Sequence, residues 1–190
     1  TGESPTLSDD EKITLLKRCK EYVGNRCLII AGTGSNDTAH SIALSIAAEE
    51  AGADALLVVS PYYNKATPQG IYLHYLSICN AVSIPVIVYN VPGRTGLDIP
   101  VSVYSQLALI PNIAGVKEAG CDITKISKIR NACGPDFPVW SGNDDQIVPV
   151  MALGGKGVIS VLSNIKPKET HDICEEYFRG NVAASAALQI

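Results

Sequence analysis

Six short apolar runs, each about as long as a β-strand, recur along the sequence at similar intervals. They cover residues 26–32, 54–60, 84–90, 112–118, 137–142 and 156–162. Within each run the side chains are apolar almost without interruption, rather than alternating with polar ones. Strands that are buried on both faces have this character, and they occur in parallel sheets covered by helices. The runs therefore predict six strands of a buried parallel sheet.

The segments between these runs have helical periodicity. Ser8 and Glu11 form a capping-box pattern, which predicts a helix that begins after Ser8, and Asp37 precedes a second helix. Further helices are predicted over residues 68–81, 101–109, 122–132, 144–152 and 168–179, with another beginning in the tail 181–190. One helix followed by six strand–helix units predicts a single domain of right-handed βαβ repeats.

Two α/β architectures are compatible with this order, an open doubly wound sheet and a (β/α)8 barrel. A doubly wound nucleotide-binding sheet usually carries G-x-G-x-x-G after its first strand. Here Gly32 and Gly34 are present but Asp37 replaces the third glycine, which favours a tight turn over a phosphate site. A barrel needs eight strands to close. We therefore expect residues 1–190 to be one TIM (β/α)8 barrel domain, with six βα units present and the first two strands absent.

The composition excludes several classes of function. The net charge is −4 and no basic block is present, which disfavours nucleic acid as a partner, and the apolar runs are too short to cross a membrane. The six cysteines form no C-x-x-C pair, which predicts reduced thiols in a cytoplasmic protein rather than a zinc site. The three histidines (His40, His74 and His171) all fall inside predicted helices, which disfavours a catalytic triad or a three-histidine metal site.

Lys117 lies at the end of the apolar run "NIAGVKE", where a barrel would gather its functional groups. A lysine amine can attack a carbonyl group and form a Schiff base, but with a pKa of ~10.4 only roughly one amine in a few thousand is neutral at pH 7. Burial would lower that pKa. The alternative is that Lys117 extends out of the barrel or pairs with Glu118. Adjacent side chains of a strand point to opposite faces, which weakens that pairing.

Tyr89 and Arg94 extend this hypothesis. Tyr89 ends the preceding predicted strand, from which its phenol could carry protons to and from imine intermediates. It could equally be an aromatic residue that packs in the core and whose hydroxyl forms a hydrogen bond there. Arg94 follows in the loop "VPGRTG" and could hold a carboxylate through two hydrogen bonds, although a loop arginine is more often simply solvated.

Several motifs, spread over essentially the whole chain, together resemble those of a known enzyme family. The sequence "YNVPGRTGLDI" is followed by "AGVKEAG", and "TGES", "AGTGSN", "SPYYNK", "SGNDD" and "GVISVLSN" occur in the corresponding order. The chain thereby resembles the Schiff-base aldolases of the dihydrodipicolinate synthase and N-acetylneuraminate lyase family. In that family the arginine of the "VPGRTG" loop binds the carboxylate of the aldehyde substrate, and sialic acid lyases lack it. Arg94 therefore favours the synthase branch.

The resemblance implies a class I aldol condensation. Lys117 would form an imine with pyruvate, and the derived enamine would add to the aldehyde of L-aspartate 4-semialdehyde. Cyclisation would then release 4-hydroxy-tetrahydrodipicolinate, on the route to diaminopimelate and lysine. The resemblance implies no cofactor and no metal, because the lysine itself serves as the electron sink.

The resemblance also assigns roles to individual residues. Tyr89 matches the proton-relay tyrosine, and Tyr63 matches a tyrosine that completes the relay in a neighbouring subunit. Thr1 matches a threonine that holds the pyruvate carboxylate, and Gly142 and Ile159 match positions that line the pyruvate pocket through their backbone. These roles imply a homo-oligomer, at least a dimer and commonly a tetramer.

The chain departs from the family pattern at both ends. The relay threonine that should precede Thr1 is absent together with both N-terminal strands, and the family's further C-terminal helices would follow Ile190. We therefore expect a barrel that is incomplete at both ends. A six-strand piece would leave sheet edges open, so we expect the isolated chain neither to fold stably nor to catalyse.

A second departure concerns feedback inhibition by lysine. Ser4, Asn36 and Tyr62 match the family's lysine-binding site. Lys12 stands where lysine-sensitive members tend to have a histidine, and His40 stands where they have a glutamate. Gaining a cation and losing an acid disfavours a cationic ligand, which predicts weak or no inhibition by lysine.

Two alternative functions remain open at this stage. One is a pyruvate-dependent aldolase or lyase that acts on a sugar acid, against which Arg94 argues. The other is a non-catalytic barrel that binds small acids, which would not need Lys117 and Tyr89 together.

Overall fold

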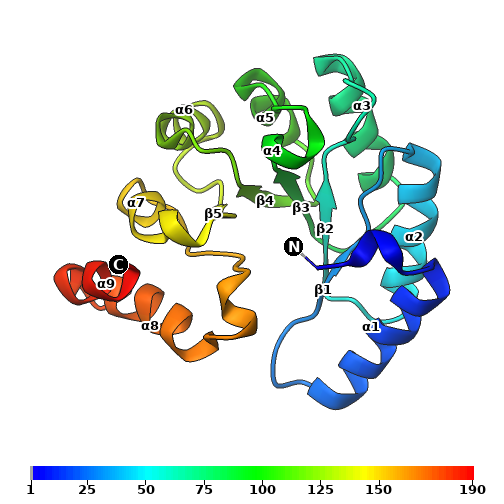
Figure 1. Ribbon diagram of the computed structural model, residues 1–190. Helices are drawn as coiled ribbons and strands as arrows, with labels where there is room; N and C mark the ends of the chain where they lie inside the picture. The colour runs from blue at the N-terminus through cyan, green and yellow to red at the C-terminus, as the bar shows by residue number, and fades with distance from the viewer. Residues whose placement is uncertain (1) are drawn as a thin grey trace.

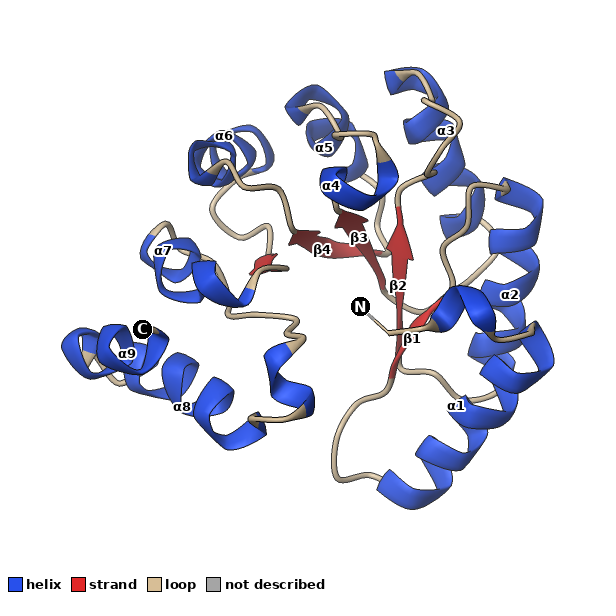
Figure 2. Ribbon diagram, in the orientation of Figure 1, coloured by secondary structure: helices blue, strands red, loops and turns tan. Residues whose placement is uncertain are grey.

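The structure is a computed structural model, and it describes residues 2–190. Its centre is a parallel sheet whose five strands follow one another in chain order (Figures 1 and 2). The strands are β1 (Ile30–Gly32), β2 (Ala55–Val59), β3 (Val86–Asn90), β4 (Ile113–Glu118) and β5 (Val139–Ser141). Each neighbouring pair is parallel, so the carboxyl ends of all five strands lie at one edge of the sheet. The predicted α/β class with a parallel sheet is confirmed.

Helices alternate with the strands and cover the outer face of the curved sheet (Figure 1). They are α1 (Asp9–Val23), α2 (Thr38–Glu50), α3 (Pro68–Cys79), α5 (Val101–Leu107), α6 (Ile123–Cys133), α7 (Ile147–Ala152), α8 (Pro167–Phe178) and α9 (Val182–Gln189). Four shorter pieces interrupt the loops, namely η1 (Ser4–Thr6), α4 (Pro92–Thr95), η2 (Asp144–Gln146) and η3 (Leu162–Asn164). No helix within residues 2–190 is both long enough and apolar enough to span a membrane.

The predicted helix starts are confirmed by their caps. The Glu11 amide donates to the Ser8 hydroxyl, and the Glu11 carboxylate accepts from the Ser8 amide at 2.8 Å, which completes the capping box of α1. The Asp37 carboxylate accepts from the Ala39 amide at 2.9 Å and caps α2. Both caps satisfy amides that have no partner inside their own helix.

The main core lies between the sheet and the helices. Its fully buried members include Leu56, Val58, Ile71, Tyr75, Ile78, Val86, Val88, Tyr104, Leu107, Val116, Ile126, Ile129 and Val139. Burying an aliphatic side chain of this size contributes about 1.5–3 kcal/mol. The Tyr75 hydroxyl donates to the Val58 carbonyl at 3.0 Å, so this large aromatic is buried without leaving a polar atom unpaired. The core therefore fixes strands β2 to β5 against their helices and holds the carboxyl ends of these strands in place.

Two of the six predicted strands differ in the structure. The strand predicted over residues 156–162 forms only in part. Residues 156–159 run parallel beside β5, where the Lys156 amide donates to the Val139 carbonyl at 2.8 Å, but the pairing amounts to an isolated bridge between Val158 and Ser141. The later amides of this segment, those of Val161 and Leu162, donate instead to the Asp144 carboxylate, which turns the chain away from the sheet. The first strand is shorter than predicted and is not buried, since Ile30 is 44% exposed. Within the described part of the chain β1 has a strand on one side only, whereas β2, β3 and β4 are buried as predicted.

The turn after β1 has a packing reason for its glycine. A Cβ atom on Gly34 would lie 2.3 Å from the backbone nitrogen of Val59, so no larger residue fits there. The following Asp37 carboxylate occupies the N-terminus of α2, where a phosphate would otherwise bind. Both observations support a tight βα turn rather than a phosphate-binding loop.

The burial of His74 leads us to predict that the folded protein loses stability in acid. This α3 residue is 3% exposed, and burial lowers the pKa of its imidazole to about 4. Its Nδ1 lies 2.9 Å from the Thr38 hydroxyl, while Nε2 has no hydrogen-bond partner among residues 2–190. Because the folded-state pKa lies below the unfolded value of ~6.5, stability is full above pH ~6.5 and declines as the pH falls toward about 4. The loss should reach about 3 kcal/mol.

The measurement is the free energy of unfolding of the full-length gene product, by denaturant titration, from neutral pH down to about 4. His74→Asn keeps a polar partner for Thr38 but does not titrate, so its stability should depend less steeply on pH. The control is His171→Asn on an exposed position of α8, which should behave like the parent. Equal slopes for all three proteins would contradict the prediction.

Candidate active site

Lys117 and Tyr89 lie side by side on neighbouring strands. They are paired in the register of β4 and β3, and the Lys117 Nζ atom lies 4.3 Å from the centroid of the Tyr89 ring. Lys117 is only 5% exposed, although it sits at the carboxyl end of its strand. The structure therefore brings together the two residues that sequence analysis predicted as nucleophile and proton relay.

The surroundings of the Lys117 amine make its neutral form easier to reach than in water. Burial lowers the pKa of this amine from its ordinary value, and the negative charge of Asp144 acts in the opposite direction. Within residues 2–190 no carboxylate lies within ion-pair distance of the amine. A buried amine with a lowered pKa and no direct counter-ion has the properties of a Schiff-base nucleophile.

Glu118 does not pair with Lys117. Its carboxylate lies on the other face of β4, where it accepts hydrogen bonds from the Asn90 side chain at 2.8 Å and from the Tyr104 hydroxyl at 2.9 Å. Lys125 on α6 lies 3.4 Å from the same carboxylate. The alternation along the strand therefore separates the two neighbouring charges, as the sequence predicted.

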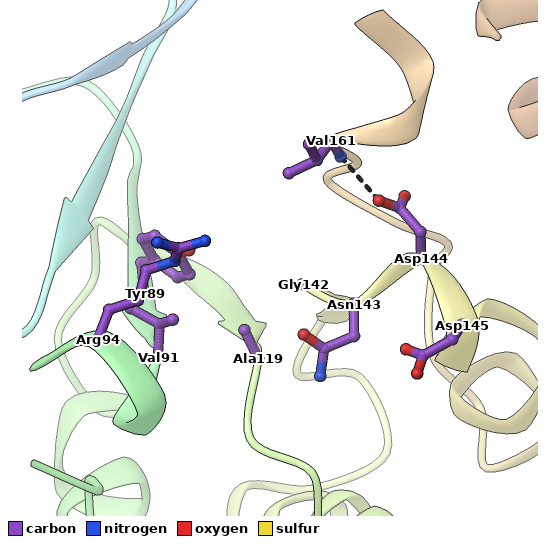
Figure 3. Close-up of a pocket in the computed structure, with 9 residues that line it drawn as sticks. All are labelled: Tyr89, Val91, Arg94, Ala119, Gly142, Asn143, Asp144, Asp145 and Val161. Carbon is purple, nitrogen blue, oxygen red and sulfur yellow. Dashed lines mark hydrogen bonds between the residues drawn. The ribbon is translucent and has the colours of Figure 1, made fainter. Parts of the chain in front are cut away.

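A cavity of about 350 Å³ opens at the carboxyl ends of the strands (Figure 3). Its lining residues are Tyr89, Val91, Arg94, Ala119, Gly142, Asn143, Asp144, Asp145 and Val161. A second, larger space of about 760 Å³ lies on the inner face of the sheet, and Lys117 lines it. Tyr89, Val91 and Arg94 line both spaces. The tyrosine and the arginine thus stand between the lysine and the smaller cavity, which has the size of a small-molecule site.

The local backbone places Arg94 and Gly142 in this cavity. Arg94 belongs to the single turn α4 directly after β3, and its amide donates to the Val91 carbonyl at 2.9 Å. The Gly142 amide donates to the Glu118 carbonyl at 2.7 Å, and a Cβ atom on Gly142 would lie 2.5 Å from that of Ala119. Glycine is therefore required where the loops after β4 and β5 meet.

Two predicted site residues, Ile159 and Tyr63, lie elsewhere, and a third is not among the described residues. Thr1 lies outside the described residues. Ile159 lines neither cavity, and its amide donates to the Ser141 carbonyl at 2.9 Å. Tyr63 also lines neither cavity. It is 86% exposed with a φ of 71°, a strained conformation for a bulky residue.

Asp144 belongs to the motif "SGNDD", but the sequence did not predict its role. Asp144 begins η2, and one of its carboxylate oxygens accepts from the amides of Val161 and Leu162 at 3.1 and 2.9 Å (Figure 3). It thereby closes one wall of the smaller cavity and places a negative charge near Lys117. The only sequence signal was its place just after a strand, which does not reveal a partner 17 residues away.

The residues compared with the family's lysine site line the larger space, with one exception. Ser4, Lys12, His40 and Tyr62 line it, whereas Asn36 does not. Lys12 and His40 both contact Asp9, at 3.1 and 2.6 Å. Asp9 is the one acid among the residues that line this space, and it already has two basic partners.

The described residues show neither a metal-binding cluster nor a disulfide. Among residues 2–190, no three His, Cys, Asp or Glu side chains gather as they would around a metal ion. All six cysteines carry free thiols.

Comparison with known proteins gives matches over the whole chain. The chain is 52% identical over 190 residues to the 4-hydroxy-tetrahydrodipicolinate synthase of Acetivibrio thermocellus, covering 100% of this chain and 64% of that relative. Its structure is similar to that of the 4-hydroxy-tetrahydrodipicolinate synthase from Methylacidiphilum fumariolicum SolV, with a TM-score of 0.97 and 39% identity, covering 99% of this chain and 63% of that one.

It is also similar to the chloride inhibited dihydrodipicolinate synthase from Acinetobacter baumannii complexed with pyruvate, with a TM-score of 0.95 and 41% identity, covering 99% of this chain and 65% of that one. The chain thus spans a little less than two thirds of the length of these relatives. The sequence model described as the Dihydrodipicolinate synthetase family matches residues 1–190. Together with the identity to its relatives, this match shows that the chain belongs to the dihydrodipicolinate synthetase family.

Proposed function

We propose that the protein is a Schiff-base enzyme that condenses pyruvate with L-aspartate 4-semialdehyde to 4-hydroxy-tetrahydrodipicolinate. The observation that carries the proposal is the buried Lys117 amine, 4.3 Å from the Tyr89 ring centroid, in the larger space that Arg94 also lines. Membership of the family and similarity to a structure complexed with pyruvate support it. The route would contribute to lysine and diaminopimelate biosynthesis in the cytoplasm, where free thiols persist.

The proposed chemistry uses Lys117, Tyr89 and Arg94. The neutral Lys117 amine attacks the keto carbon of pyruvate, and the resulting carbinolamine loses water to form the imine. In this proposal Tyr89 donates the proton that leaves with this water and accepts the proton released when the imine becomes an enamine. The enamine carbon then attacks the aldehyde of the second substrate, whose carboxylate pairs with Arg94.

Trapping the imine tests the proposal. The full-length gene product is incubated with pyruvate and borohydride, which reduces an imine to a stable amine, and the modified residue is located by mass spectrometry. We expect a single adduct on Lys117. If no adduct forms, the result supports the alternative of a non-catalytic barrel that binds small acids. Turnover with a sugar acid but not with aspartate semialdehyde would support the lyase alternative instead.

Arg94 provides a prediction about the second substrate. Arg94→Leu removes the guanidinium from the cavity wall. Because a charge-assisted hydrogen bond contributes ~1.5–3 kcal/mol, kcat/KM for aspartate semialdehyde should fall roughly 10- to 150-fold. The rate of pyruvate imine formation should change little, so steady-state kinetics and trapping are measured on the same variant. A loss confined to imine formation would contradict the assignment.

We further infer that the parallel sheet is an arc of a single eight-stranded barrel domain, of which residues 1–190 supply part. The strand order supports this, as do TM-scores of 0.95 and 0.97 to relatives that the chain covers only in part. The exposed and strained Tyr63 supports an oligomer in which this phenol enters a neighbouring site, with a dimer as the minimum and a tetramer as the common form. The expected instability and inactivity of residues 1–190 alone remain predictions.

Weak feedback inhibition is a further prediction. Asp9, the acid lining the larger space, is already paired with Lys12 and His40, so a cationic lysine ligand gains no free carboxylate there. We expect submillimolar lysine to leave the activity of the full-length gene product unchanged in initial-rate assays. The double variant Lys12→His with His40→Glu should become more sensitive. Strong inhibition of the parent by submillimolar lysine would contradict the prediction.

A further inference from the structure

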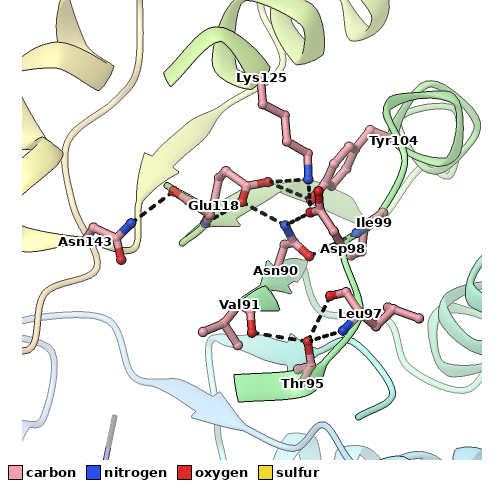
Figure 4. A network of polar contacts seen from close by, with 11 residues as sticks. Asn90, Val91, Thr95, Leu97, Asp98, Ile99, Tyr104, Glu118, Lys125 and Asn143 are labelled. Carbon is pink, nitrogen blue, oxygen red and sulfur yellow. Dashed lines mark hydrogen bonds and ion pairs between the residues drawn. The ribbon is translucent and has the colours of Figure 1, made fainter. Parts of the chain in front are cut away.

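A buried polar network centred on Glu118 lies directly behind the candidate active site (Figure 4). Glu118 is 2% exposed, and four donors surround its carboxylate. These are the Asn90 side chain at 2.8 Å, the Gly120 amide at 2.7 Å, the Tyr104 hydroxyl at 2.9 Å and the Lys125 ammonium at 3.4 Å. One carboxylate therefore holds β3, β4, α5 and α6 together.

The network repeats the register of the active site one residue further along the sheet. Asn90 follows Tyr89, Glu118 follows Lys117, and Asn90 is paired with Glu118 just as Tyr89 is paired with Lys117. The hydrogen bond between the Asn90 and Glu118 side chains lies on the outer face of the sheet. The contact between lysine and tyrosine lies on the inner face. A shift of β4 along β3 would break the first pair and separate the second.

The same network reaches the loops that line the smaller cavity. The Asn90 amide group also donates to Asp98 at 2.8 Å, and its carbonyl oxygen accepts from the Ile99 amide at 3.1 Å, which holds the segment after α4 and therefore Arg94. On the other side, the Gly120 carbonyl accepts from the Asn143 side chain at 3.1 Å. Asn143 is itself a wall residue of that cavity.

Lys125 is the cation of the network, and it lies on α6, away from the active site. Lys125 is 7% exposed and contacts both Asp98 and Glu118, so its single positive charge is shared by two carboxylates. Burial and the charge of Glu118 raise the pKa of Tyr104 well above its ordinary value, which keeps its phenol a hydrogen-bond donor. Glu118 thus has donors for its carboxylate oxygens without using Lys117.

We propose that Glu118 is a positioning residue, whose buried carboxylate fixes the register of β3 against β4 and thereby holds the Lys117 amine against Tyr89. The proposal rests on the function proposed above, because its effect is measured on the imine that Lys117 forms. Glu118 itself lines neither cavity.

The test compares Glu118→Gln and Glu118→Asp in the full-length gene product. Glutamine keeps the length of the side chain but presents an amide to Tyr104 and Lys125, and aspartate keeps the charge but is one methylene too short. If position matters, both variants should form the pyruvate imine roughly 10- to 100-fold more slowly than the parent, because small displacements of a reacting group have effects of this size. Wild-type rates in Glu118→Asp would mean that charge alone matters and would overturn the proposal.

The pH dependence of imine trapping separates positioning from a charge effect. Removing a nearby negative charge by itself would destabilise the ammonium form and move the midpoint of imine formation to lower pH. Moving the amine out of its buried site would weaken its desolvation and move the midpoint to higher pH. We expect the shift to higher pH in both variants. A lowered melting temperature with an unchanged rate and midpoint would show a purely structural role and overturn the proposal.

A milder variant tests the proposal if neither Glu118 variant folds. Tyr104→Phe removes one donor to the carboxylate and keeps the packing of the ring, so it should move the rate and the midpoint in the same directions by a smaller amount. Unchanged values in this variant would then overturn the proposal. Failure of the unmutated protein to form any trapped imine is a different result, because it contradicts the proposed function itself.

Discussion

Replacing Lys117 by methionine is expected to abolish the trapped pyruvate adduct and to reduce turnover by roughly 10⁴-fold or more, as loss of a covalent nucleophile does in other enzymes. Methionine has a similar length but no amine. Because the replaced group is buried and has no counter-ion within residues 2–190, the variant should be at least as stable as the parent. Mass spectrometry after borohydride treatment and thermal unfolding provide the two measurements.

The matched control is Lys156→Met, at an exposed position that lines neither cavity. It should retain the adduct on Lys117 and the parental turnover. An adduct that persists in Lys117→Met would show that another amine reacts. In the parent, only the neutral amine attacks, so the rate of imine formation should rise with pH through a midpoint below the ordinary lysine value of 10.5, because burial lowers the pKa of Lys117.

Tyr89→Phe is expected to reduce turnover by roughly 10²- to 10⁴-fold, the usual contribution of a positioned acid–base group. Phenylalanine keeps the ring that faces the Lys117 amine at 4.3 Å and removes only the hydroxyl. The KM for pyruvate should therefore change little while kcat falls. Steady-state kinetics on the full-length gene product measure both quantities.

Tyr22→Phe is the control for this substitution, because Tyr22 is 81% exposed on α1 and lines neither cavity. Its kinetics should match those of the parent. If Tyr89→Phe retained turnover within about twofold of the parent, the phenol would not be the proton relay. The ring would then serve only to cover the lysine.

Much of this arrangement follows from local sequence patterns. Continuous apolar runs predicted β2, β3 and β4, because strands buried on both faces need apolar side chains at every position. The contact between Tyr89 and Lys117 was predictable from the order of the strands. Consecutive parallel strands joined by one helix become neighbours, and their carboxyl ends meet.

Other features depend on contacts that leave no periodic signal. The apolar run 156–162 has the composition of a strand, but only its first part lies beside β5, and the Val161 amide donates to the Asp144 carboxylate instead. The turn α4 is only four residues long, too short for helical periodicity to reveal. The role of Glu118 depends on donors from three other elements, among them the Tyr104 hydroxyl, which sequence spacing does not bring together.

The two faces of β4 have different roles, and this separation affects how such a protein can change its substrate specificity. In the proposals made above, the inward side chain of Lys117 forms the imine and the outward side chain of Glu118 holds the framework. Exchanging a wall residue such as Arg94 alters what can be bound without removing any of the side-chain donors that surround the Glu118 carboxylate. New specificities can therefore arise by single substitutions on an unchanged scaffold.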